Sequence, residues 1–70
     1  MEKLFLISCN LRKIRSQENL RQWELSVGSG IALNRISFLE RGAPPTSREV
    51  EKITSLLGVS PSEIWPHLGR

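Results

Sequence analysis

Few residues in this sequence could carry out catalysis, and they do not cluster. Cys9 is the only cysteine and His67 is the only histidine among the 70 residues. A lone cysteine forms neither an internal disulfide nor a zinc site, and His67 has no second histidine or carboxylate at ligand spacing. Seventy residues in short helices also rarely enclose a substrate pocket. We therefore expect no catalytic residue, no metal site and no cofactor, and we expect that the chain is not an enzyme.

The run Gly28-Ser29-Gly30 raises the question of a phosphate-binding loop. A P-loop needs a preceding strand and a Lys-Ser or Lys-Thr ending, and neither accompanies this run. We therefore expect a turn between helices at this point.

Arginine and lysine are the groups that this sequence does supply for binding. Ten Lys and Arg residues stand against seven Asp and Glu residues, which gives a net charge of +3. A basic balance favours polyanionic partners such as nucleic acid. The charge is too small to decide the partner alone. We expect the cluster Arg12-Lys13-Arg15 to be a solvated helix face and not a binding site, although its charge would add to long-range attraction to DNA.

The elements that must position these groups follow helical periodicity along the whole chain, and no stretch alternates as a strand would. The sequence predicts one all-α domain over residues 1–70 with five short helices. The predicted helices span Leu4–Glu18, Gln22–Val27 or Gly28, Ala32–Glu40, 47–57 after a Thr46 cap, and 61–65 after a Ser60 cap. The fourth and fifth helices begin with capping boxes. The third, fourth and fifth helices end at Gly42, Gly58 and Pro66. The predicted buried positions of the first, fourth and fifth helices are Leu4, Ile7, Leu11, Ile14, Val50, Ile53, Leu56, Leu57, Ile64 and Trp65.

The N-terminal apolar run covers about four residues, which is too short for a signal peptide or a membrane span. The single Cys9 fits a reducing compartment. We therefore expect a soluble, cytoplasmic protein without a membrane partner.

The segment Gln22–Gly42 meets the requirements of a helix-turn-helix, in which two short helices cross steeply through a tight turn. Ser26 supplies the small side chain that lets the helices approach closely. Gly30 supplies the positive φ that the turn needs, because it has no Cβ. The apolar residues that face inward are Leu25, Ile31, Ile36 and Leu39.

These residues and their neighbours resemble the phage-repressor and Cro-like (XRE) family. The matching runs are Leu11-Arg12-Lys13-Ile14-Arg15, Gln22 to Leu25, Gly30-Ile31, Arg35-Ile36-Ser37, Leu39-Glu40-Arg41-Gly42 and Leu57-Gly58-Val59-Ser60-Pro61. The resemblance covers about residues 7–66 without a gap. It implies a five-helix, lambda-repressor-like DNA-binding domain whose third helix enters the major groove, usually as a symmetric dimer.

The resemblance also implies a role for each matching position. Side chains on the outer face of the third helix would contact base edges, and these are Leu33, Asn34, Ser37 and Phe38. Asn pairs with adenine, whereas Leu and Phe pack against thymine methyl groups. Side chains at the flanks would contact phosphates, and these are Gln22, Arg35, Arg41 and Arg48. In the family, the residue at position Gln22 also braces the recognition helix.

The sequence departs from the family pattern in its turn and on its reading face. Ser29 stands where a larger apolar residue is usual, and Gly28 lowers helix propensity by about 1 kcal/mol relative to Ala. Neither Arg21 nor Ala32 is a common helix cap. Leu33 and Phe38 are apolar where polar reading residues are frequent, which makes the base preference harder to predict.

Two functions therefore remain open from the sequence. The first is a sequence-specific, repressor-like transcriptional regulator that binds double-stranded DNA. The second is a protein-interaction module of the same fold, antitoxin-like or coactivator-like, that uses Leu33, Phe38 and Trp23 against a protein partner. Trp65 is either a core residue or a further contact with a partner. The sequence also leaves open whether the chain forms a homodimer.

Overall fold

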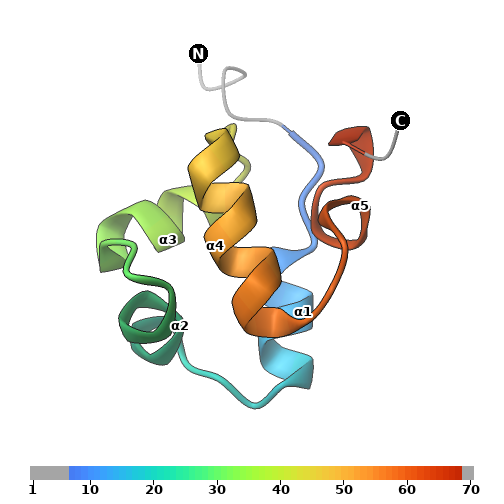
Figure 1. Ribbon diagram of the computed structural model, residues 1–70. Coiled ribbons are helices and arrows are strands. Elements are labelled where there is room, and N and C mark those ends of the chain that lie inside the picture. The colour runs from blue at the N-terminus through green and yellow to red at the C-terminus, as the bar shows by residue number, and fades with distance from the viewer. Residues whose placement is uncertain (1–6, 69–70) are drawn as a thin grey trace.

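The computed structural model describes residues 7–68, which form five α-helices and one short 3-10 helix (Figure 1). The elements are α1 (Leu11–Gln17), α2 (Gln22–Ser29), α3 (Leu33–Glu40), α4 (Ser47–Leu57), α5 (Pro61–Ile64) and η2 (Pro66–Leu68). Residues 7–68 contain no strand. The predicted all-α class is therefore confirmed.

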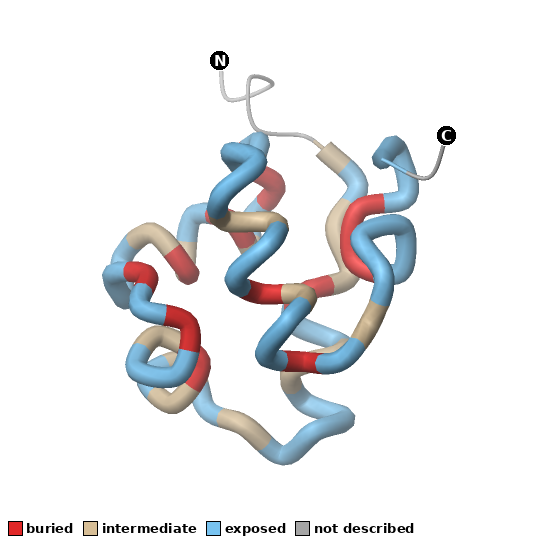
Figure 2. Tube along the Cα trace, in the orientation of Figure 1, coloured by how far each residue is buried: buried red, intermediate tan, exposed pale blue. Residues whose placement is uncertain are grey.

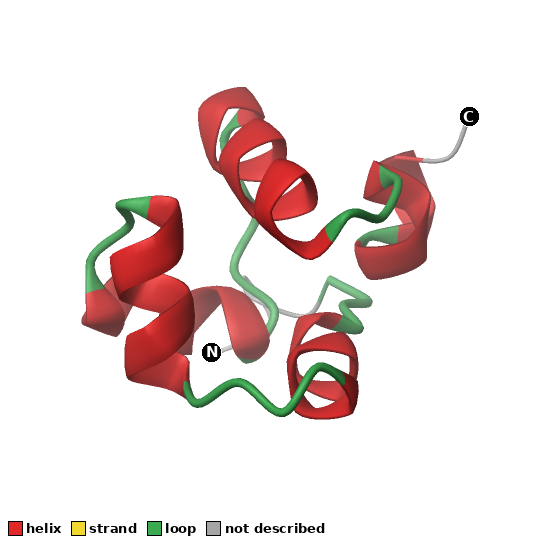
Figure 3. Ribbon diagram, turned by 60° about the horizontal axis from the view of Figure 1, so that its bottom comes forward, coloured by secondary structure: helices red, strands yellow, loops and turns green. Residues whose placement is uncertain are grey.

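The helices enclose one core, with α2 and α3 packed together on one side and α1 and α5 on the other (Figures 1 and 3). The α4 helix crosses between them and packs against both α2 and α5. Each of the five α-helices contributes at least one buried residue to this core (Figure 2). The core consists of Leu11, Leu25, Ile31, Ile36, Leu39, Ala43, Ile53, Leu57, Ile64 and Trp65.

The Trp65 side chain is fully buried, as predicted, so it is not available for the protein contact that the sequence also left open. One predicted burial assignment needs correction. Leu56, predicted to be buried, is 42% exposed. The buried side of α4 is narrower than the run of apolar residues indicates, because Ile53 and Leu57 alone lie deep in the core.

The first helix is shorter than predicted, because α1 begins at Leu11. The predicted start at Leu4 lies outside the described residues, and residues 7–10 are not helical. Their polar groups bond to distant parts of the chain. The Ile7 N–H donates to the Gly42 carbonyl at 3.3 Å, and the Asn10 N–H donates to the Ile64 carbonyl at 2.7 Å. These tertiary hydrogen bonds replace the ones that an additional turn of helix would supply.

The predicted cap of α4 is confirmed. The Thr46 N–H donates to the Glu49 carboxylate at 2.9 Å, and the Glu49 N–H donates to the Thr46 hydroxyl at 3.1 Å. At α5 the Ser60 N–H and hydroxyl both donate to the Glu63 carboxylate, at 3.1 and 3.2 Å. The α5 helix ends at Ile64, before Pro66 as predicted, and Pro66 begins the separate 3-10 helix η2.

The lone cysteine packs at the edge of the core, where it is half-buried. Burial raises the pKa of the Cys9 thiol. A raised pKa keeps the thiol protonated and less reactive.

None of the helices within residues 7–68 has the length and apolar character needed to cross a lipid bilayer.

Candidate nucleic-acid interface

A tight turn joins α2 to α3 through residues 30–32. Gly30 has φ +77°, as predicted, and its N–H donates to the Ser26 carbonyl at 2.9 Å. The Ser26 hydroxyl donates to the Ile31 carbonyl at 2.5 Å. The small residue in the middle of α2 therefore does more than permit close approach, since it ties the helix to the backbone beyond the turn.

The two unusual residues of the turn are accommodated by their surroundings. Ser29 is buried, and its hydroxyl donates to the Leu25 carbonyl at 2.7 Å and accepts from the Ile31 N–H at 3.3 Å. A Cβ on Gly28 would lie 3.0 Å from the Leu56 Cδ2 atom. The absence of a side chain at Gly28 therefore lets α2 approach α4 closely, which the sequence alone did not reveal.

The outer face of α3 faces solvent. Ile36 and Leu39 are fully buried on the inner side of this helix. Leu33 and Phe38 are each 46% exposed, Asn34 is exposed and Ser37 is half-buried. Helical spacing therefore gathers the four predicted base-reading residues on the side of α3 that is turned away from the core.

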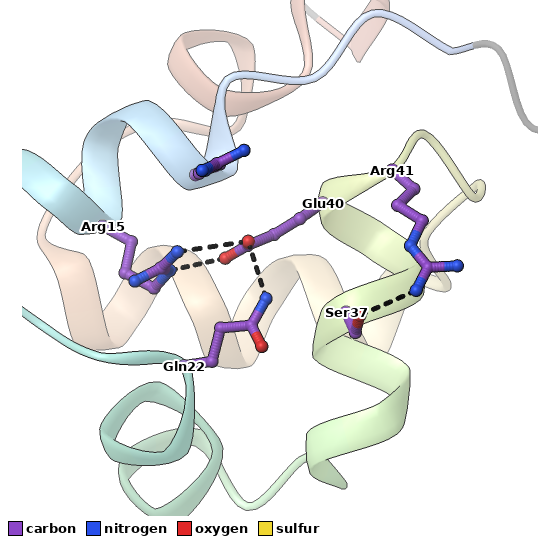
Figure 4. A pocket seen from close by; sticks show the side chains of 6 residues that line it. Arg15, Gln22, Ser37, Glu40 and Arg41 are labelled. Carbon is purple, nitrogen blue, oxygen red and sulfur yellow. Dashed lines mark hydrogen bonds and ion pairs between the residues drawn. The ribbon is translucent and has the colours of Figure 1, made fainter.

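One flank of this face is braced by a network around Glu40, the last residue of α3 (Figure 4). Arg15 from α1 donates to both Glu40 carboxylate oxygens, at 2.5 and 3.2 Å, and to the Leu20 carbonyl at 2.7 Å. Gln22 from the start of α2 donates its amide to the same carboxylate at 2.9 Å. The network joins α1, α2 and α3 at one point. Arg15 is thus not part of a solvated helix face.

The other flank is braced by Arg35 and Glu49. The Arg35 guanidinium donates to both Glu49 carboxylate oxygens, at 2.7 and 2.9 Å, and to the Pro44 carbonyl at 2.9 Å. The hydrogen bonds of this pair raise the pKa of Arg35 and lower the pKa of Glu49. Arg35 therefore links α3 to α4. Any phosphate at Arg35, as the sequence predicts, must share this guanidinium with Glu49.

The remaining predicted phosphate residues are both exposed. The Arg41 guanidinium lies 5.7 Å from the centroid of the Phe38 ring, and one of its nitrogens is 3.5 Å from the Ser37 hydroxyl. Arg48 lies in the first turn of α4. Within residues 7–68 no hydrogen bond or ion pair engages its side chain.

Each flank also contains a hollow. The α1/α3 hollow, of about 420 Å³, is lined by Arg12, Arg15, Gln22, Ser37, Glu40 and Arg41. The α3/α4 hollow, of about 320 Å³, is lined by Gly30, Ile31, Ala32, Arg35, Thr46, Arg48, Glu49 and Lys52.

Sequence reasoning missed five charged residues of these hollows as site residues. They are Arg12, Arg15, Glu40, Glu49 and Lys52. The spacing of Lys52 from Arg48 could have found it, because residues four apart share one face of a helix. No comparable signal marks Glu40 as the partner of Arg15, since 25 positions separate them.

No group of three or more potential metal ligands lies together in the part of the chain that the structure describes. The exposed apolar side chains outside α3 include Trp23 and Val27, which lie one turn apart on α2.

Comparison with known proteins gives one family match. A family model described as "Helix-turn-helix" matches residues 11–64, which is most of the chain. No curated protein and no solved structure matches the chain.

Proposed function

The chain belongs to the helix-turn-helix family of the Cro and repressor (XRE) type, and on this premise we propose that it is a sequence-specific transcriptional regulator that inserts α3 into the major groove of DNA. The family match supports a DNA-binding regulator in general.

The observation that carries the proposal is the exposed outer face of α3, held between two braced flanks. The Glu40 network fixes one side of the helix and the Arg35–Glu49 pair fixes the other. A reading helix must present its side chains in a fixed geometry, because base-edge hydrogen bonds depend strongly on distance and angle. The two flanks supply that rigidity.

The residues of the outer face have different parts in recognition. Asn34 donates to and accepts from one adenine edge, and Leu33 and Phe38 pack against thymine methyl groups. Ser37 bonds to a neighbouring base edge. Phosphate contacts from Gln22, Arg35, Arg41 and Arg48 set the register of the helix without selecting a sequence. Of these, Arg41 and Arg48 reach phosphates most directly, since both are exposed.

Assembly and location follow from this mode of binding. Two copies place their α3 helices in successive major grooves, roughly 34 Å apart, so a homodimer binds a palindromic site. Binding at a promoter then blocks polymerase. No cofactor and no catalytic step enter this mechanism, and the protein acts in the cytoplasm on chromosomal or phage DNA.

Selection of bound duplexes from a random pool tests the proposal. We expect enrichment of one half-site, repeated with two-fold symmetry about one helical turn apart. Enrichment of single half-sites would contradict the dimer but not the reading function. A pool without any enriched sequence would overturn sequence-specific reading.

One observation favours a second function, that of a protein-interaction module. The exposed apolar side chains Leu33 and Phe38 on α3, and Trp23 on α2, suit a protein surface as well as a thymine-rich groove. Titration of duplex DNA at two salt concentrations separates the two functions, because phosphate contacts make DNA affinity fall steeply with salt. The absence of DNA binding at low salt would favour the protein partner.

A further inference from the structure

The two hollows beside α3 have the same composition of charges. Each contains one arginine bonded to one glutamate, which are Arg15 with Glu40 and Arg35 with Glu49. Each also contains two further cations. These are Arg12 and Arg41 in the α1/α3 hollow, and Arg48 and Lys52 in the α3/α4 hollow.

In both hollows the acid is already neutralised by its own arginine. The two further cations therefore leave each hollow positively charged. Within residues 7–68, no carboxylate pairs with Arg12, Arg48 or Lys52. Each of these three side chains is exposed. A hollow with such a lining attracts an anion and can bond to it from two sides.

The hollows lie on opposite sides of the reading helix. At 100° per residue, Glu40 and Arg35 fall on either side of the buried pair Ile36 and Leu39. The α1/α3 hollow therefore borders one edge of the outer face, and the α3/α4 hollow borders the other. A helix in the major groove has the phosphates of one strand along one edge and those of the second strand along the other.

We propose that the two hollows bind phosphates of opposite DNA strands, with Arg12 and Lys52 as ligands in addition to Arg41 and Arg48. This inference rests on the proposed function and adds two residues to its interface. Lys52 lies one turn after Arg48 on the same face of α4. Together they close the α3/α4 hollow around a phosphodiester that also faces residues 30–32. Arg12 extends from α1 toward the hollow that Arg41 closes from α3.

Neutralising substitutions test this assignment. The variants are Arg12→Gln and Lys52→Gln, and Lys13→Gln is the matched control. Lys13 is exposed and lines a separate hollow with Asn10, Ile14, Gln17 and Glu63. All three substitutions remove one positive charge. The probe is a short duplex of mixed sequence, because phosphate contacts do not depend on sequence.

The measured quantity is the change of log Kd with log salt concentration. We expect Arg12→Gln and Lys52→Gln each to reduce this slope by about 0.9 and to weaken low-salt binding several-fold. The double variant should reduce the slope by about twice as much, since the two residues lie in separate hollows. Lys13→Gln should change the slope little. Lys52→Arg should retain it, because arginine also binds phosphate.

The outcomes distinguish this inference from the function on which it rests. If the unmodified protein binds DNA with a steep salt dependence, and Arg12→Gln and Lys52→Gln behave like Lys13→Gln, the assignment of the hollows is wrong and the proposed function stands. If the unmodified protein binds no duplex at low salt, both are wrong. Thermal unfolding of each variant checks that the fold is retained.

Discussion

On the α1 side of α3, the side chains of Arg15 and Glu40 are 12% and 5% exposed, whereas on the α4 side those of Arg35 and Glu49 are 34% and 15% exposed. Both pairs use two guanidinium nitrogens against one carboxylate. The two pairs therefore have the same hydrogen-bonding arrangement but differ in their exposure to solvent. Water screens the Arg35–Glu49 pair more strongly, so the two pairs should differ in their contribution to stability.

This difference in exposure indicates that the two flanks of α3 have different roles. The enclosed Arg15–Glu40 pair, with Gln22, fixes α3 relative to α1 and α2. The more open pair joins α3 to α4 and leaves Arg35 accessible from outside. A phosphate can therefore compete with Glu49 for Arg35 more easily than with Glu40 for Arg15, which is consistent with the predicted phosphate contact of Arg35.

Removing Glu40 should have the largest effect. Glu40→Ala leaves the Arg15 guanidinium enclosed without its counter-ion, which should lower the free energy of unfolding by about 3 kcal/mol. Urea denaturation of the unmodified and variant proteins measures this change. The double variant Arg15→Met/Glu40→Leu should recover much of the loss, because it removes both charges from the enclosed position. A loss no greater than that of Glu49→Gln would remove the distinction between the flanks.

The face between the flanks should affect recognition rather than stability. Asn34→Ala should weaken discrimination at a single base position by about 1–3 kcal/mol. Its free energy of unfolding should change by less than about 0.5 kcal/mol, because the side chain is exposed. Binding of a panel of single-base variants of a selected site measures the first effect. Equal weakening on every duplex would show that Asn34 anchors the protein and does not read a base.

Breaking the open pair should have a smaller effect than breaking the enclosed one. Glu49→Gln removes the charge opposite Arg35 but keeps a residue that completes the Thr46 capping box. We expect a loss of about 1 kcal/mol in the free energy of unfolding. Glu51→Gln, on the exposed side of α4, is the control and should be nearly neutral. Equal losses in the two variants would mean that the Arg35–Glu49 pair contributes nothing measurable.

The smallest expected effect is the pH dependence of the stability that the Arg35–Glu49 pair contributes. Arg35 holds the pKa of Glu49 below its ordinary value of 4.5 in the folded protein. The folded state therefore binds this proton less tightly than the unfolded state. The pair contributes its full stability above about pH 4.5 and loses it as the pH falls through the folded pKa. Unfolding curves at several pH values should show the difference between the unmodified protein and Glu49→Gln shrinking below pH 4.5. A difference that stays constant would contradict this linkage.

The parts of the fold that depend on local sequence could be predicted. The Thr46 capping box, the left-handed Gly30 and the inner residues Ile36 and Leu39 follow from propensity and spacing. The start of α1 could not be predicted, because hydrogen bonds to Gly42 and Ile64 decide it. The spacing of apolar residues along the predicted first helix does not indicate such distant hydrogen-bond partners.

The candidate site likewise contains residues that could be predicted from local sequence and residues that could not. Helical spacing places Leu33, Asn34, Ser37 and Phe38 on one face, and their roles in reading bases stay predictions. The bracing of α3 depends on contacts between helices, such as Arg15 with Glu40, which no local pattern indicates. The membership of Lys52 in the α3/α4 hollow likewise depends on how α4 packs beside the turn.

The two tryptophans occupy opposite environments, since Trp65 is fully buried and Trp23 is 56% exposed. The chain therefore carries two intrinsic optical reporters at different depths. The emission of the enclosed indole should shift to the red when the protein denatures, whereas the emission of the water-exposed indole should respond first to an approaching partner. With Trp23→Phe, the remaining fluorescence reports on the interior alone, and no external dye is needed to follow either event.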